Sequence, residues 1–174
     1  MKKTLSLEEM NRASAKEFTA ALADIYEHSS WIPERCTTDR PFASLTELHT
    51  ALVARLALAT NEEKMSLLCA HPELAGREAQ AGGLTSASSL EQACAKLNEL
   101  SHNEMVKITE LNLRYINKFS FPFIIAVLNH SKESIFLEFE RRVENNITDE
   151  FETALAQVNQ IAWFRLKDLF DEPA

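Results

Sequence analysis

Residues 101–119, SHNEMVKITELNLRYINKF, decide the fold class because they combine a helix start with a helical apolar stripe. Ser101 and Glu104 form an S-x-x-E capping box, in which each side chain satisfies a backbone N–H group at the start of a helix. Steps of three and four residues then place one stripe along the segment, formed by Met105, Ile108, Asn112, Tyr115 and Phe119. The stretch therefore predicts an α-helix that buries one face.

The same start signal occurs at four further places along the chain. These pairs are Ser6 with Glu9, Ser44 with Glu47, Thr60 with Glu63, and Ser88 with Glu91. The stripe after the first pair runs from Leu7 through Ser14 and Phe18 to Ile25 and predicts one continuous helix.

Later segments complete the helical pattern. Helical spacing predicts a helix from about Lys132 to Asn145 and another from about Asp149 to Phe170. The segment Phe123–Leu128 has the composition of a strand, but a single strand would have no partner, so we predict a helix begun by Pro122. The sequence thus predicts an all-α fold, a single compact helical bundle of about seven or eight helices, in one domain over residues 1–174.

Charge and composition exclude several classes of protein. A net charge of −8 without a run of Lys or Arg argues against binding to nucleic acid. No stretch approaches the ~20 apolar residues of a membrane span, and no apolar run follows the first residues, so we expect no membrane association and a cytoplasmic location. The five histidines and three cysteines show no zinc-binding spacing, which predicts a protein without a metal site.

His71 is the first candidate for chemistry. Pro72 is incompatible with a continuing helix, so the helix that begins at Asn61 should end near Ala70. A histidine at a helix C-terminus feels the negative end of the helix dipole, which suits a proton donor near neutral pH; a plain helix cap is the alternative. The irregular stretch from His71 to Ala87 is long enough to indicate a functional loop.

The segment Ser88-Ser89-Leu90-Glu91-Gln92 is the second candidate. A helix that starts here would offer free N–H groups to an anion, and the Gln92 amide can both donate and accept hydrogen bonds. The alternative is that Ser88 and Glu91 only cap a helix.

Arg165 is the third candidate because it lies on the apolar stripe of the last helix. Burying an unpaired guanidinium is costly, so it needs a partner, which could be Glu91, a substrate carboxylate, or both in turn. The alternative is a stem that lies on the core and a head that reaches water.

Taken together, the motifs resemble those of the 2-oxo-4-hydroxy-4-carboxy-5-ureidoimidazoline (OHCU) decarboxylase family over about residues 5 to 170. The motifs that carry the resemblance are His71-Pro72-Glu73-Leu74-Ala75-Gly76, Ser88-x-x-Glu91-Gln92, Asn112-x-x-Tyr115, Phe119-x-Phe121-Pro122-Phe123, Arg141-Arg142 and Ile161-x-x-x-Arg165-Leu166, with Met10-Asn11 and Glu27-His28-Ser29-x-Trp31 near the N-terminus. The chain departs from the family at Ser120 and Lys96, where glycine or a small residue is usual, and at Glu73, where aspartate is common.

The resemblance implies an all-helical homodimer that needs no cofactor and decarboxylates the small anionic ureidoimidazoline to (S)-allantoin in urate breakdown. It implies that His71 is the catalytic acid and that Arg165 faces the substrate, and we expect Glu91 to orient the His71 ring or the substrate hydroxyl. The substrate-lining residues that it implies are Pro72, Ser88, Gln92, Phe123, Ile124, Ile125, Ala126 and Val127. The residues alone leave two other functions open, a helical hydrolase of a related ureide and a non-enzymatic helical binding module.

Overall fold

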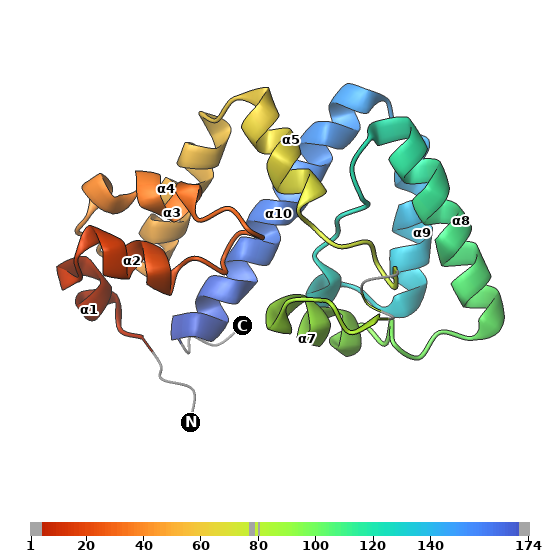
Figure 1. Ribbon diagram of the computed structural model, residues 1–174, viewed down its shortest axis with the longest axis horizontal. Helices are drawn as coiled ribbons and strands as arrows, with labels where there is room; N and C mark the ends of the chain where they lie inside the picture. The colour runs from red at the N-terminus through yellow and green to blue at the C-terminus, as the bar shows by residue number, and fades with distance from the viewer. Residues whose placement is uncertain (1–4, 77–78, 80, 171–174) are drawn as a thin grey trace. The chain divides into compact units, whose positions relative to one another are not determined.

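The computed structural model describes residues 5–76, 79 and 81–170, and the regular structure in these ranges is entirely helical (Figure 1). It consists of α1 (Leu7–Arg12), α2 (Ala15–Ala21), α3 (Trp31–Arg35), the 3₁₀-helix η1 (Thr37–Asp39), α4 (Leu45–Ala57), α5 (Asn61–Cys69), α7 (Ser86–Cys94), α8 (His102–Phe119), the 3₁₀-helix η2 (Val127–Asn129), α9 (Lys132–Arg142) and α10 (Ile147–Phe170). The predicted all-α class is confirmed. No helix within these ranges is long and apolar enough to cross a membrane.

The chain folds into two compact units. Unit 1 comprises residues 1–67 and 159–174, and unit 2 comprises residues 68–158. Helices α5 and α10 each contribute residues to both units. A single domain over residues 1–174 stays a prediction.

The N-terminal segment of unit 1 forms two helices where the sequence predicted one. α1 ends at Arg12, and Ser14 then starts α2 with a capping box of its own. Ser14 Oγ accepts from the Glu17 N–H at 3.3 Å, and Glu17 Oε2 accepts from the Ser14 N–H at 2.9 Å. The predicted continuous helix over residues 7–25 is wrong, because a serine side chain competes for backbone groups and favours a helix start over a helix interior.

The core of unit 1 is built around α4 and the end of α10. The predicted stripe of α4 is buried at Leu45, Leu48, Leu52 and Leu56. Two side chains bind Asn159 of α10: Tyr26 Oη donates to its Oδ1 at 3.0 Å, and His49 Nε2 lies 2.9 Å from its carbonyl oxygen. These contacts fix the part of α10 that leads to Arg165.

Unit 2 is organised by α8 and α9, which lie side by side (Figure 1). Tyr115, on the predicted and buried stripe of α8, is the centre of an aromatic cluster. The ring centroids of its neighbours lie 4.6 to 5.8 Å from that of Tyr115, and these neighbours are Phe119, Phe121, Phe123 and Phe139. The cluster therefore packs the segment that follows α8 against α9.

The segment after Pro122 is not the helix that the sequence predicted. Residues 122–126 have no regular structure, and only the single turn η2 follows. Side chains take the place of helical hydrogen bonds: Arg142 Nη1 donates to the Ile124 carbonyl at 2.8 Å, and Gln157 Oε1 accepts from the Ala126 N–H at 2.8 Å. Because buried backbone groups must be paired, these two side chains allow an irregular segment inside the core.

The predicted helix starts are confirmed at four of the five places. In each of these four, a Ser or Thr hydroxyl accepts from the N–H three residues later, as seen at Ser6, Ser44, Thr60 and Ser101. The fifth is wrong, because α7 starts two residues before Ser88 and has Thr85 as its N-cap. Thr85 Oγ1 accepts from the Ser88 N–H at 3.2 Å, so Ser88 lies within the first turn.

Candidate active site

His71 lies in unit 2 at the point where α5 ends. Its N–H donates to the Leu68 carbonyl at 3.2 Å, which closes a last turn after Cys69. The predicted place at a helix C-terminus, immediately before Pro72, is therefore confirmed. His71 is only 8% exposed and Pro72 is half-buried, so the imidazole is largely shielded from water.

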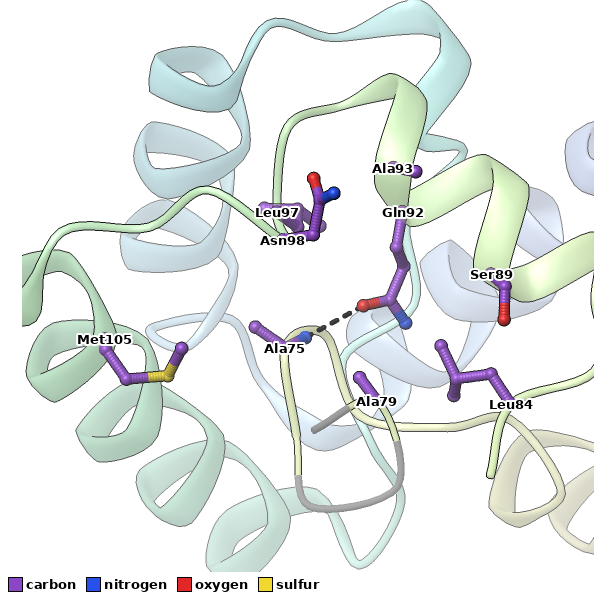
Figure 2. Close-up of a pocket in the computed structure, with 9 residues that line it drawn as sticks. All are labelled: Ala75, Ala79, Leu84, Ser89, Gln92, Ala93, Leu97, Asn98 and Met105. Carbon is purple, nitrogen blue, oxygen red and sulfur yellow. Dashed lines mark hydrogen bonds between the residues drawn. The ribbon is translucent and has the colours of Figure 1, made fainter. Parts of the chain in front are cut away.

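Two side-chain amides hold the backbone of the loop that follows. Gln92 Oε1, on α7, accepts from the Ala75 N–H at 3.0 Å (Figure 2), and its Nε2 donates to the Glu73 carbonyl at 3.5 Å. Asn112 Nδ2, on α8, donates to the Leu74 carbonyl at 3.0 Å. The substrate contact predicted for Gln92 stays a prediction, and the structure adds a role for its amide in shaping the loop.

Three residues near these elements have a left-handed backbone conformation. The φ angles are 47° at Ala75, 56° at Lys96 and 64° at Ser120. This region costs a residue with a side chain about 1–2 kcal/mol, and glycine adopts it freely. Lys96 and Ser120 are two positions where the resemblance leads us to expect glycine or a small residue, and the positive φ at each gives a physical reason for that expectation.

Helix α7 carries the second predicted group of residues. Ser88 is 4% exposed and Gln92 is 7% exposed, whereas Glu91 is half-buried. Thr85 Oγ1 donates to Ser88 Oγ at 3.0 Å in addition to capping its N–H. The N–H of Ser88 is thus paired within the protein, so the predicted free N–H donor at this residue is wrong.

The stretch that the resemblance places at the substrate, Phe123 to Val127, is apolar and buried, and we call it the apolar wall. Every residue from Phe123 to Val127 is at most 5% exposed. The turn η2, which begins at Val127, packs against α7. Within unit 2, α7 thus contacts the loop after His71 through Gln92, and it also contacts the turn at the end of this wall. A contact between the His71 and Glu91 side chains stays a prediction.

A buried ion pair of Arg142 with Glu150 contacts the apolar wall at Phe123 and Ile124. Arg142 is 1% exposed and Glu150 is 0% exposed. Arg142 donates to Glu150 Oε1 through Nε at 2.9 Å and through Nη2 at 2.6 Å, and its guanidinium carbon lies 4.4 Å from the centre of the Phe123 ring. Tyr115 Oη donates to the same carboxylate oxygen, and Asn145 Nδ2 donates to the other at 2.7 Å. The carboxylate is fully paired, as a buried charge requires.

Burial also acts on the tyrosine of this cluster. Desolvation raises the pKa of Tyr115, and the hydrogen bond to Glu150 raises it further. The phenol therefore keeps its proton and acts as a donor. Tyr115 and Arg142 both lie in the sequence motifs, but the sequence alone indicates no role for either residue. Helical spacing is the signal that could have indicated the ion pair of Arg142 with Glu150. Arg142 lies three residues after the buried Phe139 and Glu150 lies four residues before the buried Ala154, so each shares a helix face with a core residue.

Arg165 belongs to unit 1 and has a partner that the sequence did not indicate. Its Nη1 lies 2.8 Å from Glu27 Oε2 and donates to the Asp24 carbonyl at 3.2 Å. The side chains of Arg165 and Glu27 are 8% and 3% exposed. The alternative in which the head of Arg165 reaches water is therefore wrong, and its predicted contact with substrate stays a prediction.

A pocket of about 320 Å³ opens beside the loop that Gln92 holds (Figure 2). The described residues that line it are mostly apolar: Ala75, Ala79, Leu84, Ser89, Gln92, Ala93, Leu97, Asn98 and Met105. Ala75 and Gln92 thus face the pocket and also shape the loop after His71. Within the described part of the chain, no three His, Cys, Asp or Glu side chains gather as a metal site.

Comparison with known proteins identifies the relatives of this chain. The sequence profile described as OHCU decarboxylase matches residues 11–167. The 2-oxo-4-hydroxy-4-carboxy-5-ureidoimidazoline decarboxylase of Haloferax volcanii is 39% identical over 166 residues, which are 95% of this chain and 96% of that protein. The protein of the same name from Halalkalicoccus jeotgali is 36% identical, over 95% and 92% of the two chains.

A solved structure also resembles this chain in its fold. The crystal structure of an (S)-allantoin synthase superimposes with a TM-score of 0.78 at 28% sequence identity and covers 96% of this chain. The present chain spans 55% of that longer protein.

Proposed function

The chain belongs to the OHCU decarboxylase family, and from this premise we propose how its residues carry out the reaction. The enzyme decarboxylates 2-oxo-4-hydroxy-4-carboxy-5-ureidoimidazoline to allantoin in urate degradation. The observation that carries this conclusion is the 39% identity to a decarboxylase of nearly the same length. The stereochemistry of the product, proposed as (S), rests on the name of the structural relative.

The substrate itself explains why the protein needs few chemical groups. Its carboxylate is attached to a carbon that also bears a hydroxyl and adjoins a C=N bond. When the C–C bond to the carboxylate breaks, the electron pair moves into the C=N group and CO₂ leaves. The C=N nitrogen takes up a proton as it receives this pair. The hydroxyl then loses its proton and becomes a carbonyl, and the neighbouring carbon, which was part of the C=N bond, gains a proton. We therefore expect a reaction that needs no cofactor.

The protein has three tasks in this scheme: to hold an anion, to stabilise the developing charge and to deliver one proton to one face. We assign the proton to His71, whose buried position at the end of α5 shields it from water. Glu91 on α7 orients the ring or the substrate hydroxyl. General acid–base help of this kind contributes roughly 10²- to 10⁴-fold to the rate.

The substrate contacts follow from the same assignment. Pro72, Ser88 and Gln92 line the site, and the buried stretch from Phe123 to Val127 forms its apolar wall. An apolar wall lowers the local dielectric, which strengthens the hydrogen bonds that hold the anion. Arg165 contributes a planar fork of donors to the substrate carboxylate, with Glu27 fixing its orientation.

Product analysis tests this proposal. The unstable substrate is generated in situ from urate with urate oxidase and the hydrolase that follows it, and the release of CO₂ is measured with and without the enzyme. Acceleration above the spontaneous rate supports decarboxylation. Release of ammonia or of a ring-opened acid would instead identify a ureide hydrolase, and an unchanged rate would identify a binding module.

The assembly and location of the enzyme are further proposals. We propose a homodimer in the cytoplasm that binds a small anionic ureidoimidazoline and neither nucleic acid nor membrane. The net charge of −8 supports the lack of nucleic-acid binding. Sedimentation equilibrium at several protein concentrations would contradict the homodimer if it gave the mass of one 19.7 kDa chain throughout.

A further inference from the structure

We propose that Asn112, on α8, is a positioning residue that fixes the His71 side chain through the backbone of the loop between them. This inference rests on the proposed function. Asn112 Nδ2 donates to the Leu74 carbonyl at 3.0 Å, and the residue is 7% exposed. It makes this contact from a helix that contributes no predicted substrate contact.

The geometry shows how a contact at Leu74 reaches His71. On one side, the His71 N–H is bound to the Leu68 carbonyl at the end of α5. On the other side, only Pro72 and Glu73 separate it from Leu74, and proline has a fixed φ. The imidazole therefore lies on a short, stiff segment that is anchored at both ends.

The two amides complement each other along the loop. Gln92 binds the backbone of Glu73 and Ala75, and Asn112 binds the residue between them. Ala75 has a φ of 47°, a conformation that an alanine adopts only where its surroundings impose it. Loss of the Asn112 donor would therefore let the middle of the loop relax.

A second observation indicates that Asn112 is not present for stability alone. Among the described residues, its Oδ1 is a buried acceptor without a hydrogen-bond partner. A buried acceptor of this kind is destabilising, so an apolar side chain of similar size would remove one defect while it unpairs the Leu74 carbonyl. Because these two effects oppose each other, Asn112 should change the free energy of unfolding little, while its amide still holds the backbone of the loop at Leu74.

The test is the variant Asn112→Leu, compared with Asn11→Leu as a matched control. Asn11 also holds a backbone by its amide, since it donates to the Phe42 carbonyl and accepts from the Phe42 N–H, both at 2.8 Å. We expect Asn112→Leu to melt within about 3 °C of the wild type and to lower kcat by about 10- to 100-fold with a smaller change in KM. Asn11→Leu should lower the melting temperature and leave kcat of the folded enzyme unchanged.

Two readouts separate positioning from a purely structural role. In a double-mutant cycle, substitutions of residues that act as a unit do not have additive effects. If Asn112 acts through His71, Asn112→Leu should lower kcat by less than about threefold when His71 is already replaced by alanine. An NMR titration of the His71 ring, which needs no turnover, should give a different midpoint in Asn112→Leu than in the wild type. An unchanged midpoint together with wild-type kcat would overturn the proposal. A wild-type enzyme without decarboxylase activity would instead overturn the proposed function.

Discussion

The buried ion pair behind the apolar wall gives a quantitative prediction. Arg142→Met leaves the Glu150 carboxylate, which is 0% exposed, without its cation. Breaking a buried pair by removing one partner costs about 3–5 kcal/mol. The Ile124 carbonyl also loses its donor, and an unpaired buried carbonyl costs about 1–3 kcal/mol. Because contributions from one network are not additive, we expect a loss of about 3–5 kcal/mol in the free energy of unfolding.

Urea unfolding followed by circular dichroism measures this loss. The matched control is Arg114→Met, which removes an exposed ion pair with Glu144 and should cost less than about 1 kcal/mol. The double variant Arg142→Met/Glu150→Gln should recover part of the loss, because it removes the uncompensated buried charge while the amide oxygen of the introduced glutamine can still accept from Tyr115. A loss below about 1 kcal/mol for Arg142→Met, or no recovery in the double variant, would refute the reasoning.

Three further predictions concern the backbone, the thiols and the pH dependence. Ser120→Gly should stabilise the protein by about 0.5–1 kcal/mol in thermal unfolding, since φ is 64° there, whereas Gly82→Ala, at a φ of 72°, should destabilise it; equal signs would contradict this. A thiol reagent at pH 8 should modify the exposed Cys69 and Cys94 and reach the fully buried Cys36 only on unfolding. Burial raises the pKa of Cys36 to about 11 and also raises that of Tyr26, so the folded state holds these protons longer than the unfolded chain does. The free energy of unfolding should therefore keep its full value below about pH 8.5 and fall as the pH rises toward 11, and a stability that increases over this range would be the contrary result.

Local signals in the sequence predicted most of the helices. The hydroxyl caps at Ser6, Ser44, Thr60 and Ser101 depend on residues three positions apart, so they are visible in the sequence alone. Ser14 shows the limit of the apolar stripe, because its side chain starts a new helix where the spacing predicted a continuous one. The position of His71 was also predictable, since Pro72 fixes the end of α5.

Contacts between distant residues account for what the sequence did not predict. The wall after Pro122 is irregular because Arg142 and Gln157 bind its backbone from helices 18 and 31 residues away. Glu27 and Arg165 pair across 138 residues, and no spacing rule connects them. Such partners are set by tertiary packing, which overrides local preference.

The central claim is that His71 delivers the proton that makes allantoin. The most direct measurement follows allantoin by circular dichroism as the substrate is generated from urate, with wild type, His71→Ala and, as a control, the exposed His102→Ala. The account predicts rapid formation of one enantiomer by the wild type and by His102→Ala, and slow formation by a folded His71→Ala. Rapid, single-enantiomer product from His71→Ala, or slow racemic product from the wild type, would contradict it.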